Sequence, residues 1–174
     1  MSTPSIERQD ALDECRVTRE RVAATYCRGL LDLVYEAATV HRRCHDPETV
    51  QCASLLSVKT GGCSEDCAYC PQSAHYDASV DSTELMSLSD VVTAAERAKV
   101  AGADRFCMGA AWPQVSDGPE FDRVLSMVRA VKEMGLETCV TLGMLEADHA
   151  KQLSAAGLDS VSYTHLRAHE TRED

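Results

Sequence analysis

The sequence predicts an α/β domain built around a parallel sheet of about four strands. One unit recurs along the chain: an amphipathic helix, a glycine that ends it, a strand, and a second glycine. Strands that alternate with helices of about 10–15 residues are typical of right-handed βαβ crossovers in a parallel sheet. A closed eight-stranded (β/α) barrel takes about 250 residues, whereas this chain has 174. The residues alone therefore leave two alternatives, a small open α/β sheet or an interrupted barrel.

The elements are justified in order from the amino terminus. Residues 17–43 carry apolar side chains at helical spacing among charges, so we expect one or two amphipathic helices there. A short buried strand at 54–58 is ended by Gly61 and Gly62. The repeated unit then predicts helices at 87–100, 120–134 and 147–156, each followed by a glycine suited to the left-handed position after a helix. The predicted strands lie at 54–60, 104–109, 138–143 and 158–163.

Composition and charge exclude several classes of function. The net charge of −11 and the pI near 4.9 argue against binding to nucleic acid or to anionic membranes, since both need a basic face. The first ten residues lack the basic start and apolar stretch of a secretory signal, and no apolar run approaches the roughly 20 residues of a membrane span. We therefore expect a cytoplasmic protein. Its nine cysteines are then expected to be free thiols for metal binding or catalysis rather than a disulfide framework.

Three of the cysteines form a cluster that is typical of a metal site. Cys63, Cys67 and Cys70 follow one another at a spacing of C-x3-C-x2-C. Thiolates are soft ligands that suit iron–sulfur clusters and zinc. Three thiolates on one loop, facing a common centre, can hold a cubane cluster and leave its fourth iron open. The alternative is a structural zinc site with His75 as fourth ligand, which we disfavour because no second C-x2-C pair follows and because a loop histidine is more often exposed.

The cluster and several longer segments resemble a known enzyme family. C-x3-C-x2-C with Tyr69 just before the last cysteine resembles the signature of radical S-adenosylmethionine enzymes. The similarity to the biotin synthase family is closer and runs from about residue 17 to residue 159. It is carried by residues 30–37, 55–73, 105–112 and 134–143, in order and at matching separations. This resemblance implies the N-terminal half of a (β/α)8 TIM-type barrel over residues 51–159, preceded by a helical extension over residues 1–50.

The resemblance also implies a first cofactor site. Cys63, Cys67 and Cys70 would hold a [4Fe–4S] cluster, and S-adenosylmethionine would bind its open iron. Tyr69 would lie against the adenine, where ring stacking contributes affinity; without the motif, a core aromatic would be the better interpretation. Gly109 and Ala110, at a strand end, would let backbone groups reach the methionyl end of this cofactor.

A second cluster is implied within the barrel. In the family, the positions of Cys107 and Cys139 ligate a [2Fe–2S] cluster together with two ligands from later strands. Taken alone, each cysteine is more often a buried small hydrophobe. The strand period of two predicts that Arg105 shares a face with Cys107, and that Thr141 shares one with Cys139. Arg105 is therefore expected beside the anionic cluster, unless it faces solvent at the strand start.

The implied activity is that of a sulfurtransferase of the biotin synthase type. Sulfur would be inserted into dethiobiotin by radical chemistry, with no catalytic side chain beyond the cluster ligands. The family also implies a flavodoxin-type electron donor and a homodimer at full length. Two alternatives stay open, namely another radical S-adenosylmethionine enzyme that shares only the first cluster, and a zinc-stabilised scaffold without catalysis.

The pattern of the family breaks after Asp159. Polar residues that contact the cofactor are expected next, yet Thr164 and Leu166 stand near those positions, and Leu166 cannot accept a hydrogen bond. Residues 160–174 are interpreted as a non-native tail on a truncated reading frame. Because the other two ligands of the second cluster and half of the barrel would then be missing, we predict that this chain alone is inactive.

Overall fold

The computed structural model describes residues 17–162, and the chain divides into two compact units between Val50 and Gln51. In the first unit, α2 (Arg19–Tyr26) and α3 (Leu30–Cys44) are helices where the sequence predicts one or two at 17–43; α3 is amphipathic, whereas α2 is not. Helix α2 begins at Thr18, whose hydroxyl accepts the N–H of Arg21. None of the described residues in either helix is buried.

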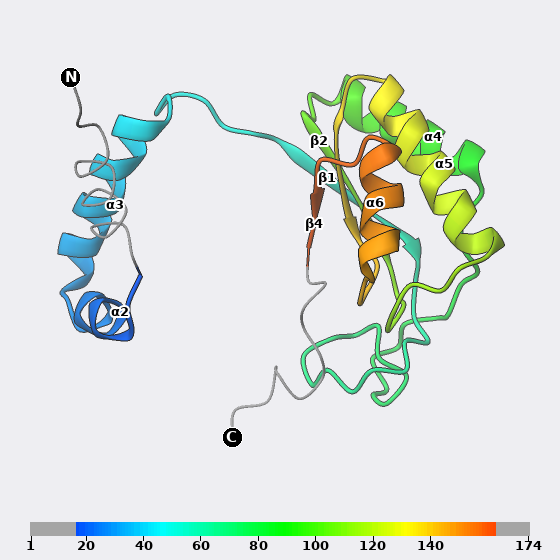
Figure 1. The fold of residues 1–174 in the computed structure, drawn as a ribbon, viewed down its shortest axis with the longest axis horizontal. Coiled ribbons are helices and arrows are strands. Elements are labelled where there is room, and N and C mark those ends of the chain that lie inside the picture. The colour runs from blue at the N-terminus through cyan, green and yellow to red at the C-terminus, as the bar shows by residue number, and fades with distance from the viewer. Residues whose placement is uncertain (1–16, 163–174) are drawn as a thin grey trace, which may run out of the picture. The chain divides into compact units, whose positions relative to one another are not determined.

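The second unit contains a four-stranded parallel sheet. Its strands are β1 (Ala53–Lys59), β2 (Arg105–Ala110), β3 (Glu137–Thr141) and β4 (Ser160–Val161), and they lie side by side in chain order. Helices α4 (Leu88–Val100), α5 (Pro119–Glu133) and α6 (Ala147–Ala155) connect successive strands and cover the same side of the sheet (Figure 1). This singly wound arrangement is that of one half of a (β/α)8 barrel.

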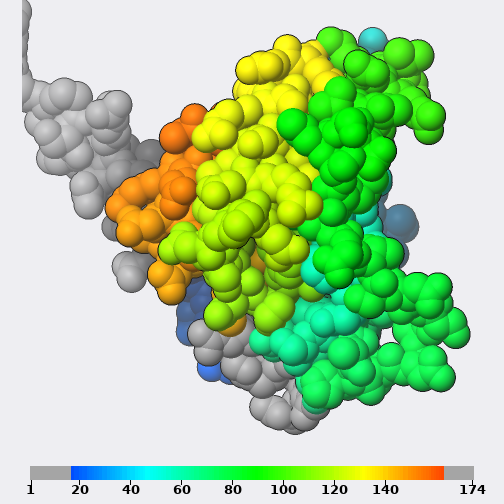
Figure 2. All heavy atoms as spheres, turned by 90° about the vertical axis from the view of Figure 1, so that its right-hand side faces the viewer, coloured from blue at the N-terminus to red at the C-terminus, as the bar shows by residue number. Residues whose placement is uncertain are grey.

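The core lies between the sheet and this layer of helices. Along β2, Phe106 and Met108 are buried against the helices, whereas Arg105, Cys107 and Gly109 alternate with them on the other face. Helix α5 supplies the largest share of the core, namely Phe121, Val124, Leu125, Met127, Val128 and Val131. Figure 2 shows the helices closing over this side of the sheet. None of the helices of the second unit, within residues 51–162, covers the opposite face, and the candidate site lies there.

The predicted order of helices and strands is confirmed, with two adjustments of boundaries. The strand expected at 104–109 spans Arg105–Ala110, because Ala110 still pairs with Lys59 of β1. Strand β4 is only two residues long, Ser160 and Val161, and pairs with Cys139 and Val140. The rest of the predicted tail beyond residue 162, with Thr164 and Leu166, lies outside the described residues.

The predicted helix-ending glycines adopt the required conformation. Gly102, Gly135 and Gly157 have φ of 90°, 80° and 96°, and each follows a helix C-cap. Each turn returns the chain to the amino-terminal edge of the sheet. No helix within residues 17–162 is both long and apolar enough to cross a membrane.

Candidate functional site

The loop with the three clustered cysteines leaves the carboxyl end of β1, the end of a barrel strand where enzymes of this fold place their sites. Both ends of the loop are tied together at that point. The N–H of Thr60 donates to Thr83 Oγ1 at 3.0 Å, and the N–H of Thr83 donates to the Thr60 carbonyl at 2.8 Å. The N–H of Met86 donates to the Val58 carbonyl at 2.8 Å. The loop is therefore a closed structure held against the sheet.

Two glycines bring the returning chain close to the start of this loop. Gly61 and Gly62 have φ of 69° and 70°, a region that side chains rarely occupy. A Cβ atom on Gly61 would lie 3.0 Å from Ser82 Cα, and one on Gly62 would lie 2.9 Å from Ser82 Oγ. Glycine is thus required for both the turn and the close approach.

Backbone hydrogen bonds fold the loop so that its first and last cysteines come near each other. The N–H of Cys63 donates to the Gln72 carbonyl at 3.0 Å, and the Cys63 carbonyl accepts the N–H of Ala74 at 2.8 Å. The N–H of Cys70 donates to the Cys67 carbonyl at 3.0 Å, which forms a tight turn between these two cysteines. The buried hydroxyl of Ser73 donates to the Glu65 carbonyl at 2.6 Å and braces the centre of the loop.

The electrostatics of the loop show that the thiols interact. Partial burial raises the pKa of the Cys63 thiol, and the nearby Cys70 raises it further, although the N–H of Glu65 acts in the opposite direction. Burial, followed by Cys70, also raises the pKa of the Cys67 thiol. Three neighbouring thiolates repel one another, so a bound cation would lessen the repulsion and favour loss of the thiol protons.

The donor set fits an iron–sulfur cluster better than a single ion. Within residues 17–162, no three His, Cys, Asp or Glu side chains are grouped closely enough to hold one metal ion. A cluster binds each thiolate at a different iron, which sets its sulfur ligands farther apart than the ligands of one ion. His75 is exposed, as expected, and its Nε2 lies 3.0 Å from the Ser64 carbonyl. The choice between a cluster and zinc stays a prediction.

The residues expected to contact S-adenosylmethionine differ in what they offer. Tyr69 is 65% exposed, so the core-aromatic interpretation is wrong. A Cβ atom at Gly109 would meet nothing within 4 Å, so the backbone there is open to a ligand. The Ala110 side chain is buried toward the helices, and its carbonyl accepts the N–H of Trp112 at 2.8 Å. The cofactor role of these three residues stays a prediction.

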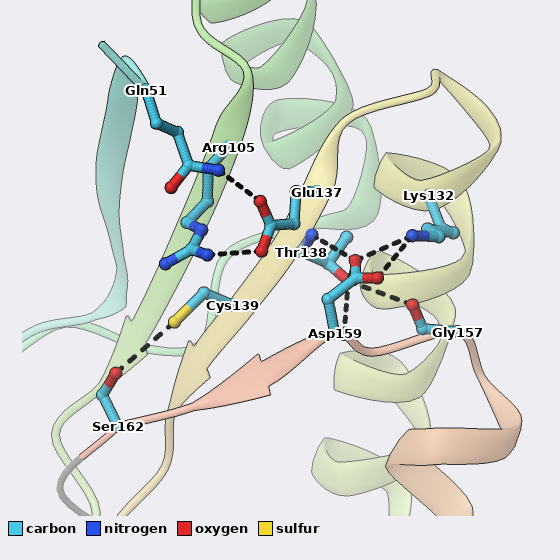
Figure 3. A network of polar contacts seen from close by, with 9 residues as sticks. All are labelled: Gln51, Arg105, Lys132, Glu137, Thr138, Cys139, Gly157, Asp159 and Ser162. Atoms are coloured by element: carbon cyan, nitrogen blue, oxygen red, sulfur yellow. Dashed lines mark hydrogen bonds and ion pairs between the residues drawn. The ribbon is translucent and has the colours of Figure 1, made fainter. Parts of the chain in front are cut away.

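A second pair of thiols lies on the open face of the sheet. Cys107 of β2 and Cys139 of β3 are register partners, directly opposite each other on neighbouring strands. Cys139 is buried, and Cys107 is partly exposed. Burial and then the neighbouring Cys139 raise the pKa of Cys107 to about 11. Cys139 Sγ also lies 3.5 Å from Ser162 Oγ, just beyond β4 (Figure 3).

Arg105 lies on the same face and is held by an ion pair. It is the register partner of Glu137, whose carboxylate accepts from the Arg105 guanidinium and from Gln51 Nε2 (Figure 3). The hydrogen bond that Arg105 donates to Glu137 raises the pKa of Arg105, so the guanidinium stays charged. Arg105 Nε is buried and has no hydrogen-bond partner among the described residues. The predicted shared face of Arg105 and Cys107, and that of Cys139 and Thr141, agree with the alternation along β2 and with the register pairs of β3.

Sequence reasoning missed three residues of this face. Glu137 stands two residues before Cys139, so the strand period could have placed it there. Gln51 precedes its strand and Ser162 follows β4, and no periodic signal marks either of them. Their contacts depend on how separate strands align.

Comparison with known proteins assigns the class. Residues 57–165, more than half of the chain, match the model of the Radical SAM superfamily, whose members use S-adenosylmethionine (SAM). The chain belongs to this superfamily. Among curated relatives it is similar to the biotin synthase of Methylobacterium nodulans, with 55% identity over 94% of this chain and 49% of the relative. The biotin synthases of Methylobacterium radiotolerans and Myxococcus xanthus are 61% and 56% identical over 78% and 82% of this chain, and over 40% and 41% of their own lengths. The chain spans about half the length of these relatives.

Proposed function

We propose that this chain carries the cluster-binding part of a biotin synthase, an enzyme that inserts sulfur into dethiobiotin. The observation that carries the proposal is the second pair of thiols, Cys107 opposite Cys139 on the open face of the sheet. A radical S-adenosylmethionine enzyme that used only the first cluster would have no need of soft ligands there. The identity of 51–61% to relatives named biotin synthase supports the same function.

Each group of residues has a distinct proposed role. Cys63, Cys67 and Cys70 are the ligands of a [4Fe–4S] cluster that leaves one iron open for S-adenosylmethionine. Tyr69 stacks on the adenine, while Gly109 and Ala110 form the backbone surface for the rest of the cofactor. When bound, the cluster and S-adenosylmethionine would supply the radical chemistry.

The chain's own side chains prepare the second site. Cys107 and Cys139 are proposed as two of the ligands of a [2Fe–2S] cluster. The Arg105 guanidinium, held by Glu137, places a fixed positive charge on the face that would receive an anionic cluster. The helices pack against the other face of the sheet and hold the strands that carry these ligands in a close-packed core. No side chain is proposed as an acid or base.

The partners follow from the proposed reaction. Dethiobiotin is the proposed substrate, a flavodoxin-type protein the electron donor, and a homodimer the state of the whole enzyme. The described cysteines are all free, as a reducing cytoplasm would keep them. The chain alone is proposed to be inactive, because it provides only two of the four ligands of the second site.

A chimera tests the activity. Residues 51–159 would replace the matching segment of the Methylobacterium nodulans relative, and the chimera would be expressed in a strain that cannot make biotin. We expect growth without biotin, and loss of growth when either Cys107 or Cys139 is changed to Ala. A Thr141→Ser chimera is the matched control on the same face. Failure of a folded chimera that has taken up its first cluster would contradict the proposed substrate.

The cluster on the loop is tested on the chain itself. After anaerobic reconstitution with iron and sulfide, we expect iron, sulfide and a reducible [4Fe–4S] signal in electron paramagnetic resonance. Cys67→Ser should abolish the signal, whereas Cys44→Ser, at an exposed cysteine of the first unit, should leave it unchanged. Zinc binding in place of iron would support the scaffold alternative.

A further inference from the structure

We propose that Cys107 and Cys139 form a reversible disulfide bond when the metal-free chain meets a disulfide oxidant. The pair is then a site of covalent redox modification. This inference is independent of the proposed function, because the register of two strands is enough to bring the thiols together.

The register provides the geometry. Cys107 and Cys139 are Cα partners on adjacent parallel strands, and such strands lie about 4.8 Å apart. This separation falls within the range of about 4.4–6.8 Å that disulfides span between Cα atoms. Both side chains project from the same face of the sheet, so their sulfurs lie side by side. No other described cysteine is a register partner of either one.

The different exposure of the two thiols sets the order of events. Cys107 is partly exposed on the open face and can reach an oxidant such as oxidised glutathione, whereas Cys139 is only 4% exposed. The Cys107 sulfur attacks one sulfur of oxidised glutathione and releases one glutathione thiol, which leaves a mixed disulfide on Cys107. The Cys139 sulfur then attacks Cys107 Sγ and releases the second glutathione. Two protein thiols lose two protons and two electrons, and the oxidant is reduced to two thiols.

The same register predicts that the bond is easily reduced. Side chains on parallel strands run side by side, so the two Cβ atoms lie about as far apart as the Cα atoms, beyond the roughly 3.5–4.5 Å that a relaxed disulfide prefers. A strained disulfide has a more oxidising potential than a structural one. The disulfide is therefore reversible rather than a permanent cross-link. Under the proposed function, forming it removes two sulfur ligands of the second site at once.

Peptide mapping of the full chain tests the proposal. The chain is purified with a reductant and a chelator, exposed to oxidised glutathione, quenched with N-ethylmaleimide and digested with trypsin. Cleavage after Arg105, Arg123, Lys132 and Lys151 gives peptides 106–123 and 133–151, each with a single cysteine. We expect these two peptides to be joined, and to separate again in a low concentration of dithiothreitol before the chain is denatured.

A denatured sample provides the control for chance pairing. In urea, Cys107 can pair with any of the other cysteines, so the joined peptide should be at least about fivefold less abundant than in the native chain. Equal abundance in the two samples would overturn the proposal. So would a native chain in which Cys107 keeps its glutathione adduct while Cys139 stays free, because the sulfurs would then be out of reach.

Two variants test the order of events. Cys139→Ser should retain glutathione on Cys107, and Cys107→Ser should leave Cys139 unmodified. Circular dichroism establishes that each variant is folded. The peptide mapping of the chain without substitutions does not depend on these variants. Rapid modification of Cys139 in the Cys107→Ser variant would contradict its buried position.

Discussion

Replacing Asp159 by Ala should destabilise the second unit by removing the carboxylate that joins β3, β4 and α5. Asp159 accepts hydrogen bonds from Lys132 Nζ at 2.7 and 2.8 Å, from the N–H of Thr138 at 2.8 Å and from Thr138 Oγ1 at 3.1 Å (Figure 3). Thr138 is fully buried, so its N–H has no access to water when the carboxylate is removed. The Thr138 hydroxyl keeps a partner, the Gly157 carbonyl at 3.1 Å.

The expected loss is about 2–3 kcal/mol in the free energy of unfolding. A buried N–H left without an acceptor contributes about 1–3 kcal/mol of this loss. The ion pair with Lys132 adds little, since its side chains are 42% and 31% exposed and exposed pairs are worth about 0–1 kcal/mol. Asp159→Asn should cost less than Asp159→Ala, because an amide oxygen can still accept from Thr138. Lys132→Met should cost least.

Urea unfolding followed by circular dichroism measures the three variants against the unchanged chain. The pKa of Asp159 is lowered by Lys132 first and then by the N–H of Thr138. The stabilisation by the Asp159 carboxylate is therefore complete above its ordinary pKa of 3.8 and is lost as the pH falls through its lower pKa in the folded chain. The Asp159→Ala and unchanged chains should thus converge in stability at acidic pH. The reasoning is refuted if Lys132→Met is as destabilising as Asp159→Ala.

Three further predictions concern the backbone and the thiols. Gly143→Ala should lower the free energy of unfolding by more than about 2 kcal/mol, because φ is 74° and the new Cβ would overlap the backbone of Trp112 and Pro113. Gly135→Ala should lower it by only about 1 kcal/mol, because the new Cβ has open space and only the φ of 80° is unfavourable. Equal losses in urea unfolding would contradict this. The rate at which iodoacetamide alkylates Cys107 should keep rising up to about pH 11, as the raised pKa requires, and a plateau near pH 9 would contradict it. Iron uptake by the loop should weaken as the pH falls, because the raised pKa values of Cys63 and Cys67 favour the protonated thiols, and uptake that is constant between pH 9 and pH 7 would contradict this.

The order of elements could be predicted because each one leaves a periodic signal in the sequence. Helix α5 places Phe121, Val124 and Val128 on one buried face, and a glycine follows each helix of the sheet unit. The spacing of Cys63, Cys67 and Cys70 likewise predicts a metal-binding loop without knowledge of its backbone hydrogen bonds. The strand period placed Arg105 on the face of Cys107. These properties depend on residues close together in the chain.

Contacts between strands could not be predicted in the same way. The pairing of Arg105 with Glu137, and of Cys107 with Cys139, depends on the register of β2 and β3, which no single segment encodes. The exposure of Tyr69 depends on how the loop folds back on itself, so the residue type without the motif would favour a buried side chain. The sequence places Ala110 at a strand end for its backbone groups, and the alternation of β2 turns its side chain toward the helices.

The strict chain order of the four strands has a consequence for synthesis on the ribosome. Each strand pairs with the one translated just before it, and the helix between them supplies the apolar surface that covers the new pair. A nascent chain can therefore add one βα unit at a time, without waiting for a distant segment to emerge. The thiols of β2 and β3 would become neighbours as soon as β3 leaves the exit tunnel.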